Sequence, residues 1–217
     1  FGTDVTLIEA LPNILPIEDE AISKELEQLF KKRKMNILTN TKVDRIEKLQ
    51  SQVKVHLKIG DIVEAEKALI AVGVQGNIEE LDLELCKIIV EKDWIQVNEF
   101  METNVPNIYA IGDVVGPPWL AHVASAEGII AVEHMAGLKP EPMRYDNIPG
   151  CTYCHPEVAS VGLTEIMAVE QGYKIKIGTF PFRGLGKAMA IGDTDGFVKV
   201  IYDAKYGEML GCHIIGA

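Results

Sequence analysis

The sequence predicts an α/β fold whose last third changes to α+β. Apolar strands and amphipathic helices follow one another in the first part of the chain, whereas strands with a single short helix dominate beyond about residue 150. Of the 217 residues, 47% are hydrophobic and 24% are charged, which is typical of a globular chain. This length allows one large domain or two small ones.

The charge balance argues against two classes of partner. The 32 Asp and Glu residues outnumber the 21 Lys and Arg residues, so the formal net charge is −11. Nucleic acids and anionic membranes bind basic surfaces, so neither is expected as the main partner. No apolar run approaches the roughly 20 residues of a membrane span, and residues 1–4 resemble no signal or transit peptide. Four cysteines are too few for a disulfide-stapled scaffold, which favours a reducing compartment.

The first predicted elements are an apolar strand at Val5–Ile8 and a helix. The acidic run Glu18–Glu20 suits the positive N-terminus of this helix, and the basic run Lys31–Lys34 suits its C-terminus. We interpret the basic run as a solvated helix end and not as a phosphate or nucleic-acid site. The core face of the helix repeats at helical spacing and consists of Ile22, Leu26, Leu29 and Phe30.

Short strands are predicted next, at residues 36–38, 43–46 and 53–57. Gly60–Asp61 indicates a turn to a returning strand. Apolar and polar residues alternate along 53–57, so His56 is predicted to be a surface residue. Ala68–Gly73 is predicted to be a buried apolar strand that ends in glycine.

The chain is acidic from Gly76 to about Asn98. Tyr109–Asp113 is then predicted to be another buried strand, and Ala121–Met135 a largely buried helix closed by Gly137. Residues 139–149 contain three prolines and are predicted to form a linker.

The last third is predicted to contain a helix at Thr164–Gln171, capped by Thr164, and paired strands at Phe197–Tyr202 and Glu208–Ile215. Both ends of the chain lie in strands, and unpaired buried strands leave backbone groups unsatisfied. We therefore expect the chain to be a piece of a longer protein.

Glu9 is the first candidate for a binding residue. In Rossmann-like dinucleotide-binding folds, an acidic residue at the C-terminal end of the second strand holds the adenosine ribose hydroxyls. Glu9 follows an apolar strand in this way, and the glycine fingerprint would lie before residue 1. A carboxylate repels a 2′-phosphate, so the sequence favours NAD over NADP.

The stretch Thr103–Asp113 carries a more specific signal. It resembles the second flavin-binding motif of the FAD-dependent pyridine nucleotide–disulfide oxidoreductases, in which a Thr leads into a strand ending Ala-x-Gly-Asp. The resemblance implies that Asp113 binds the ribityl chain of FAD, while Gly112 lets the backbone approach the ligand. The alternative is an ordinary core strand with a solvent-facing Asp113.

Leu120–His122, followed by Ala126–Gly128, resembles the flavin-contacting helix of the same family. The resemblance implies that the helix N-terminus faces the pyrimidine side of the flavin, where it can stabilise negative charge. Leu120, Ala121 and His122 are therefore predicted to contact FAD, with His122 ordering or capping the site. Trp119 stands where the family usually has Met, and an aromatic ring can pack there.

Within the family, the resemblance is closest to members that oxidise dihydrolipoamide, and it covers essentially the whole chain. It is carried in addition by residues 4–9, 40–43, 71–73, 155–165, 180–182 and 196–199. It implies that Val43 and Gly73 lie beside NAD, although Val74–Gly76 departs from the usual Gly-Arg-Arg-Pro-like residues.

The resemblance further implies three domains in this chain. Residues 1–75 would be the second half of an NAD-binding domain, 76–145 a central domain that contacts FAD, and 146–217 the start of an interface domain for dimerisation. The parent would be a homodimer in the bacterial cytoplasm or the mitochondrial matrix, with a dihydrolipoyl substrate or a lipoyl-bearing acyltransferase of a 2-oxo acid dehydrogenase complex as partner.

No catalytic residue is assigned here, because the family's redox disulfide and its His/Glu base belong to other parts of the parent protein. The alternatives are a related flavin disulfide reductase, of the mercuric or glutathione reductase type, and a non-catalytic binding or dimerisation module.

The Cys151–Cys154 stretch has the Cys-x-x-Cys spacing of a redox pair. A redox-active thiol of this kind sits at a helix N-terminus, whereas these residues lie in a predicted strand. We interpret both as buried or half-buried structural thiols, and we expect no metal site because a second ligand pair is missing. Gly184–Lys187 lacks the spacing of a phosphate-binding loop and is predicted to be an ordinary loop.

Overall fold

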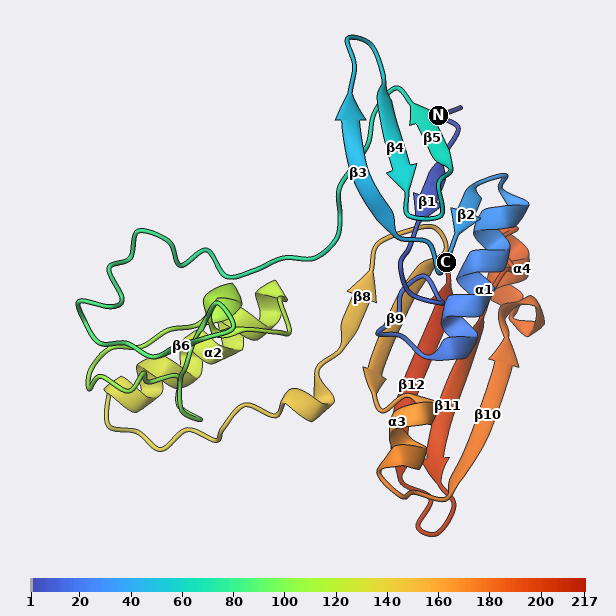
Figure 1. Ribbon diagram of the computed structural model, residues 1–217. Coiled ribbons are helices and arrows are strands. Elements are labelled where there is room, and N and C mark those ends of the chain that lie inside the picture. The colour runs from blue at the N-terminus through green and yellow to red at the C-terminus, as the bar shows by residue number, and fades with distance from the viewer. Residues whose placement is uncertain (1) are drawn as a thin grey trace. The chain divides into compact units, whose positions relative to one another are not determined.

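The computed structural model describes residues 2–217 (Figure 1). The chain divides into two compact units, one made of the chain up to Ile70 together with Pro149–Ala217 and the other of Ala71–Ile148. Within residues 2–217, no helix combines the length and the apolar character that crossing a membrane requires. The three-domain division expected for the parent stays a prediction.

The first unit begins with a strand, a helix and a strand. β1 (Thr6–Ile8) pairs in parallel with β2 (Asn36–Leu38), and α1 (Glu20–Lys32) connects them. Asp19 caps α1 by accepting a hydrogen bond of 3.0 Å from the Ala21 N–H. Parallel strands need such a crossover, so the predicted order of these elements is confirmed.

A three-stranded antiparallel sheet follows, made of β3 (Val43–Lys48), β4 (Val53–Leu57) and β5 (Ile62–Ala65). The alternation predicted for β4 is confirmed, since Val55 and Leu57 are buried. The prediction that His56 is a surface residue is wrong. Its side chain is only 15% exposed, because its Nε2 atom lies 3.1 Å from Glu47 Oε2 on the neighbouring strand.

The rest of the first unit is a five-stranded antiparallel sheet in the order β10-β11-β12-β9-β8. The strands are β8 (Gly150–Thr152), β9 (Glu157–Gly162), β10 (Ile175–Pro181), β11 (Phe197–Asp203) and β12 (Met209–Gly216). Two short helices accompany them, α3 (Glu165–Glu170) and α4 (Gly186–Ile191). The predicted α+β character, the Thr164 cap and the last strand pair are confirmed. The prediction of an ordinary loop at Gly184–Lys187 is wrong, because α4 begins at Gly186.

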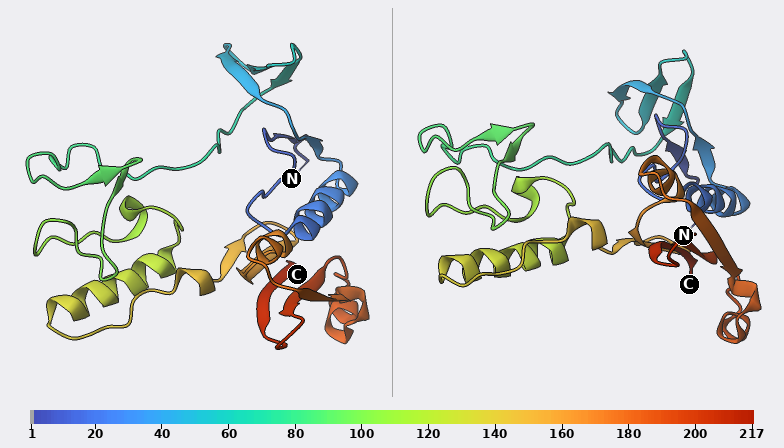
Figure 2. Two further views of the ribbon diagram at one scale, coloured as in Figure 1. Left: turned by 60° about the horizontal axis from the view of Figure 1, so that its bottom comes forward. Right: turned by 90° about the horizontal axis from the view of Figure 1, so that it is seen from below.

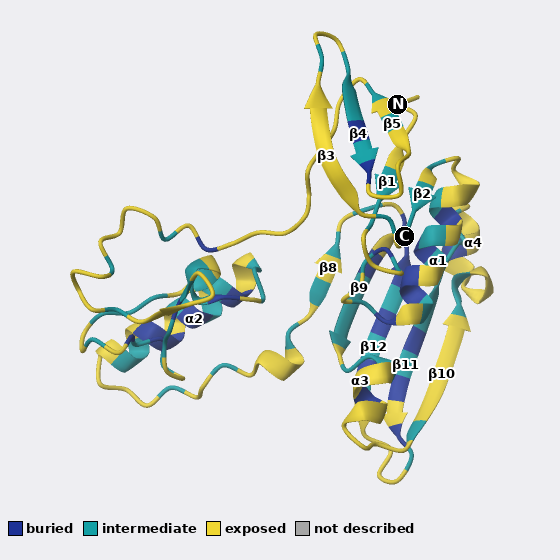
Figure 3. Ribbon diagram, viewed as in Figure 1, coloured by how far each residue is buried: buried dark blue, intermediate teal, exposed yellow. Residues whose placement is uncertain are grey.

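The core of the first unit joins residues that are distant in the sequence. The buried face of α1 packs against the five-stranded sheet, in which β11 and β12 are the most buried strands (Figures 2 and 3). The buried residues of this cluster are Ile14, Ile22, Leu26, Leu29, Val158 and Ile215. Burying this apolar surface stabilises α1 and the sheet together.

The second unit contains a small hairpin and one long helix. β6 (Val90–Glu91) and β7 (Trp94–Ile95) form the hairpin, and the short 3₁₀ helices η1 (Gly112–Val115) and η2 (Tyr145–Asn147) flank α2 (Ala121–Met135). The predicted ends of α2 are confirmed, and Gly137 closes the helix with φ of +75°. The prediction that α2 is largely buried is wrong, because three of its apolar side chains are more than half exposed: Ile129, Val132 and Met135.

Two predicted buried strands are absent. Residues 68–73 form no strand, and Leu69 and Val72 are 93% and 91% exposed. Tyr109–Asp113 is not a strand either, since within residues 2–217 only the isolated bridge between Glu102 and Tyr109 pairs it. A strand needs a continuous row of hydrogen-bonded neighbours, and the described part of the chain supplies only this bridge and the adjacent bond from Ala110 to Met101.

Candidate functional site

The turn that carries Gly112 and Asp113 leads directly toward α2. Gly112 has a φ of +72°, and a Cβ atom at this position would lie 3.2 Å from the Ala124 Cβ of α2. Glycine is favoured here because it adopts this conformation easily and lets the turn approach the helix. The turn therefore lies close against the first half of α2.

A buried carboxylate, that of Glu127, joins the turn to the helix. The residue is 2% exposed, and its Oε2 atom accepts a hydrogen bond of 2.7 Å from the Gly112 N–H. Its Oε1 atom accepts a hydrogen bond of 2.7 Å from the Tyr145 hydroxyl. Glu127 lies in the helix motif predicted from the sequence, which assigns it no function of its own. The signal that could have identified it is its place between the apolar and small residues of the middle of α2, where a charged side chain needs a partner.

Asp113 lies in η1 and is exposed, so its carboxylate is available to a ligand. At the start of α2, Leu120 is the N-cap residue and provides no side-chain cap, and the first turn contains no acidic residue. The positive end of this 15-residue helix thus has no anionic side chain of its own. Ala121 and His122 are both exposed in this first turn.

Trp119 precedes this helix and is half-buried. Its ring meets that of Trp94 edge-on, with ring centroids 6.4 Å apart. The Nε1 atom of Trp119 is buried and has no hydrogen-bond partner among residues 2–217. A buried donor without an acceptor is costly, so an acceptor on a ligand at this position would stabilise the site.

The six residues predicted to contact FAD all lie in the second unit, on η1 and the segment that leads into α2. Together they offer an exposed carboxylate for hydroxyl groups, a helix N-terminus for a partial negative charge and an indole donor for a carbonyl. These donors and acceptors fit the ribityl hydroxyls and the ring carbonyls of a flavin.

Two of the three residues predicted to contact NAD lie in the first unit. Glu9 directly follows β1 and is half-buried, and its Oε1 atom accepts a hydrogen bond of 2.8 Å from the Leu11 N–H. The Glu9 carbonyl accepts a bond of 2.9 Å from Thr41, two residues before Val43. Gly73 belongs to the second unit, where it is exposed with φ of +123° and nothing near its missing Cβ.

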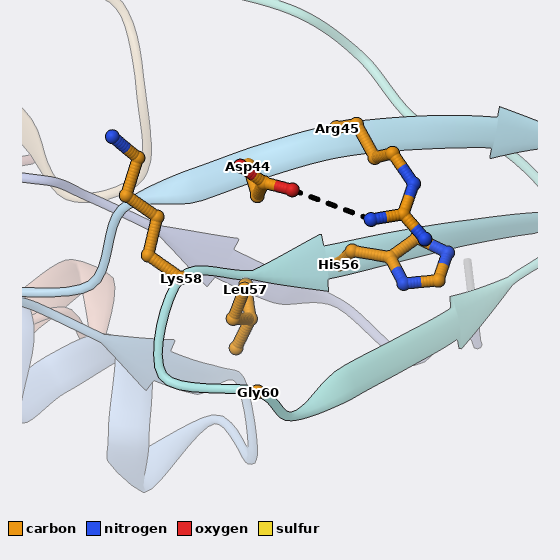
Figure 4. Close-up of a pocket in the computed structure, with 6 residues that line it drawn as sticks. All are labelled: Asp44, Arg45, His56, Leu57, Lys58 and Gly60. Carbon is orange, nitrogen blue, oxygen red and sulfur yellow. Dashed lines mark hydrogen bonds and ion pairs between the residues drawn. The ribbon is translucent and has the colours of Figure 1, made fainter.

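A hollow in the three-stranded sheet lies beside Val43, which pairs with Leu57 (Figure 4). In this hollow the Arg45 guanidinium lies 3.3 Å from the Asp44 carboxylate, whereas Lys58 points away from that pair. The hollow contains none of the predicted site residues. Its lining consists of Asp44, Arg45, His56, Leu57, Lys58 and Gly60.

The two thiols of the Cys-x-x-Cys stretch have different surroundings. Cys151 is exposed, so the prediction that both thiols are buried or half-buried is wrong for this residue. Cys154 is half-buried, and its Sγ atom donates to the Pro156 carbonyl at 3.0 Å. Burial raises the pKa of the Cys154 thiol, and the neighbouring Cys151 and Glu157 raise it further. Within residues 2–217, no group of three His, Cys, Asp or Glu residues is placed to hold a metal ion.

Two residues of the basic run at the end of α1 contact other parts of the first unit. Arg33 donates to the His155 carbonyl, and Lys32 lies 3.4 Å from Asp195. Residues 31–34 are all exposed, so the interpretation of a solvated helix end is confirmed, and two of its residues in addition have partners just before β9 and β11.

Two family models match the chain. The model described as pyridine nucleotide-disulphide oxidoreductase matches residues 1–128, and the model of its dimerisation domain matches residues 148–217.

Curated relatives match over the whole chain. A dihydrolipoyl dehydrogenase of Bacillus subtilis is 48% identical over 221 residues, which cover 100% of this chain and 47% of that protein. A dihydrolipoyl dehydrogenase of Rhizobium etli is 45% identical over 222 residues, which cover 100% of this chain and 46% of that protein. The chain thus spans about half the length of the curated relatives that it matches.

Solved structures share the fold. LpdA from Mycobacterium tuberculosis superposes with a TM-score of 0.90 at 27% identity, and the match covers 99% of this chain and 47% of that chain. The HOCl-induced flavoprotein disulfide reductase RclA from Escherichia coli superposes with a TM-score of 0.92 at 30% identity, covering 100% of this chain and 50% of that chain.

Proposed function

The chain belongs to the pyridine nucleotide-disulphide oxidoreductase family, and on this basis we propose that its parent protein oxidises a dihydrolipoyl dithiol to the disulfide with NAD⁺. The observation that carries the proposal is the identity of 45–48% to dihydrolipoyl dehydrogenases along the full length of this chain. The family uses FAD and a pyridine nucleotide, so the donors and acceptors of the second unit have a defined cofactor to serve.

The residues around η1 and α2 would hold FAD. When bound, FAD would supply the two-electron redox chemistry that connects the dithiol to NAD⁺. Asp113 accepts hydrogen bonds from hydroxyl groups, Gly112 permits close approach of the backbone, and the Trp119 Nε1 atom donates to an acceptor. The N-terminus of α2, at Leu120–His122, stabilises negative charge, which makes electron uptake by a neighbouring group more favourable.

Glu9 would bind the ribose of NAD, and Val43 and Gly73 would line the same cofactor. The carboxylate of Glu9 accepts hydrogen bonds from two hydroxyls and repels a 2′-phosphate, which favours NAD over NADP. The Leu11 N–H already holds the Oε1 atom of Glu9, so this side chain needs little reorientation to bind a ribose.

The proposed parent is a homodimer, since residues from 148 onward match a dimerisation domain. Its partner is the dihydrolipoyl group, free or carried on the acyltransferase of a 2-oxo acid dehydrogenase complex. The four thiols described are free, which suits a reducing compartment such as the bacterial cytoplasm or the mitochondrial matrix.

A second candidate is a flavin disulfide reductase that runs in the opposite direction and reduces a disulfide with a pyridine nucleotide. The fold shared with the flavoprotein disulfide reductase RclA favours this candidate. The two candidates differ in substrate and not in the cofactors that the chain's residues would hold.

Steady-state assays of the purified parent distinguish the candidates. We expect NADH formation from dihydrolipoamide and NAD⁺, at a rate well above that of NAD(P)H oxidation by glutathione disulfide or mercuric ion. The 217-residue chain alone should give no turnover above a flavin blank, because the family's redox disulfide and His/Glu base are expected in other parts of the parent. A parent that reduces glutathione disulfide or mercuric ion faster than it oxidises dihydrolipoamide would contradict the proposal.

A further inference from the structure

We propose that Glu127 is a positioning residue for FAD, which holds the Gly112–Val115 turn in the shape that lets Asp113 bind the ribityl chain, and that Tyr145 holds Glu127 in place. The inference rests on the proposed function only in that η1 faces the flavin. In this proposal Glu127 does not contact the cofactor and acts only by holding Gly112.

The turn depends strongly on the Glu127 carboxylate. Ile111, which precedes η1, is extended, so the Gly112 N–H has no acceptor within the turn itself. The bond that closes η1 at its C-terminal end runs from the Gly116 N–H to the Asp113 carbonyl at 3.4 Å, which is long for an N–H···O bond. The bond of 2.7 Å to Glu127 is short and charge-assisted, and it is therefore the stronger restraint on Gly112.

Because Glu127 is buried, its carboxylate favours the one arrangement in which both oxygens are hydrogen-bonded. A carboxylate that is 2% exposed must be compensated by donors, because leaving it unpaired in an apolar setting is costly. Each oxygen receives one donor, the Gly112 N–H and the Tyr145 hydroxyl. No Lys or Arg among residues 2–217 forms an ion pair with it, so these two hydrogen bonds are its main compensation.

Tyr145 supplies the second anchor from the segment that was predicted to be a linker. Its hydroxyl binds Oε1 and so leaves Oε2 directed at Gly112. Burial raises the pKa of the Tyr145 hydroxyl, and the hydrogen bond to Glu127 raises it further. The hydroxyl therefore stays protonated and remains a donor at any pH at which the protein is ordinarily handled.

The test uses the full-length parent, stripped of flavin and titrated with FAD while flavin fluorescence is recorded. In the variant Glu127→Gln, the neutral amide has only one acceptor oxygen, so it cannot accept from both the Gly112 N–H and the Tyr145 hydroxyl. We expect the Kd for FAD to rise roughly tenfold. Tyr145→Phe keeps the charge and the Gly112 bond, and should raise the Kd by about threefold. The matched control Glu133→Gln makes the same chemical change on the same helix and should leave the Kd unchanged.

A double-mutant cycle separates positioning from a general effect on stability. If Glu127 acts through the turn, then adding Glu127→Gln to Asp113→Ala should weaken FAD binding little beyond Asp113→Ala alone. Additive losses of FAD affinity, with an equal loss of thermal stability in the flavin-free protein, would overturn the proposal.

The outcomes are distinguishable from those that test the proposed function. A parent that binds FAD tightly but does not oxidise dihydrolipoamide contradicts the proposed substrate and leaves the role of Glu127 intact. An unchanged Kd for FAD in both Glu127→Gln and Tyr145→Phe contradicts the role of Glu127, whatever the substrate is.

Discussion

Lys199 and Asp19 form a buried ion pair although they lie 180 positions apart in the chain. The Lys199 Nζ atom is 2.8 Å from Asp19 Oδ1 and 2.7 Å from Glu165 Oε2, while the side chains of Lys199 and Asp19 are 6% and 1% exposed. Asp19 also caps α1 and accepts from the Glu165 N–H at 3.1 Å. One carboxylate thus connects the start of α1 to β11 and to the start of α3.

Removal of one partner of this pair should be strongly destabilising. Lys199→Met leaves the Asp19 carboxylate buried without its cation, and we expect a loss of about 3 kcal/mol in the free energy of unfolding. The double variant Lys199→Met with Asp19→Asn keeps an acceptor for the α1 cap and should recover part of that loss. Calorimetry of the parent measures both. The control Lys24→Met breaks an ion pair whose side chains are 59% and 50% exposed and should cost under about 0.5 kcal/mol. Equal effects of Lys199→Met and Lys24→Met would contradict the prediction.

The same pair makes stability depend on pH in two windows. Burial alone would raise the pKa of Asp19, but hydrogen bonds from Lys199, Glu165 and Ala21 outweigh it and lower the pKa below the ordinary 3.8. Burial alone would lower the pKa of Lys199, but Asp19 and Glu165 outweigh it and raise the pKa above the ordinary 10.5. The stabilisation from the ion pair is therefore complete between the ordinary pKa of Asp, 3.8, and the ordinary pKa of Lys, 10.5. It is lost as the pH falls through the lowered pKa of Asp19, and as the pH rises through the raised pKa of Lys199. The difference in Tm between wild type and Lys199→Met should be largest near neutral pH and shrink at both extremes. A difference that grows toward acid would contradict this assignment.

Glu9→Ala in the parent should weaken NAD⁺ binding. Loss of two hydrogen bonds to a charged acceptor corresponds to roughly 1–3 kcal/mol, or about 5- to 150-fold in Kd. Isothermal titration with NAD⁺ measures the effect, and Glu64→Ala, which removes an exposed carboxylate from β5, is the control. An unchanged Kd would make Glu9 an ordinary surface acid.

Asp113→Ala and Asp113→Leu should both lower the flavin content of the purified parent. The Leu variant should lower it more, because an apolar group leaves the ribityl hydroxyl without an acceptor. The ratio of flavin to protein absorbance is the measurement, and Asp146→Ala, at an exposed ion pair with Arg144, is the control. A full complement of FAD in Asp113→Leu would show that the Gly-Asp motif has been misinterpreted.

Cys151→Ser and Cys154→Ser should leave both FAD content and turnover close to those of the wild type. The raised pKa of Cys154 keeps its thiol protonated, and a protonated thiol is a poor nucleophile. Loss of turnover with FAD retained, in either variant, would identify this pair as the redox centre.

Local patterns predicted the elements whose stability is largely local. The ends of α2, the Thr164 cap and the β11–β12 pair followed from helix periodicity, capping and turn residues. The failures have a common physical cause. Ala68–Gly73 and Tyr109–Asp113 have the composition of strands, but strand formation depends on neighbours that the local sequence does not specify.

The candidate site was predicted only where its residues are contiguous in the sequence. Asp113 and the start of α2 were found because the motif is contiguous in the sequence. The contacts of Glu127 with Gly112 and Tyr145 span 15 and 18 positions, and the pair of Asp19 with Lys199 spans 180, so neither was visible in local spacing.

The exposed apolar segment around Leu69 and Val72 can associate with other chains. It is uncharged from Ala68 to Gln75 and contains three β-branched residues, which are features that favour strand pairing with other chains. Burial of this segment against further protein surface would remove an edge on which strands of other chains can pair.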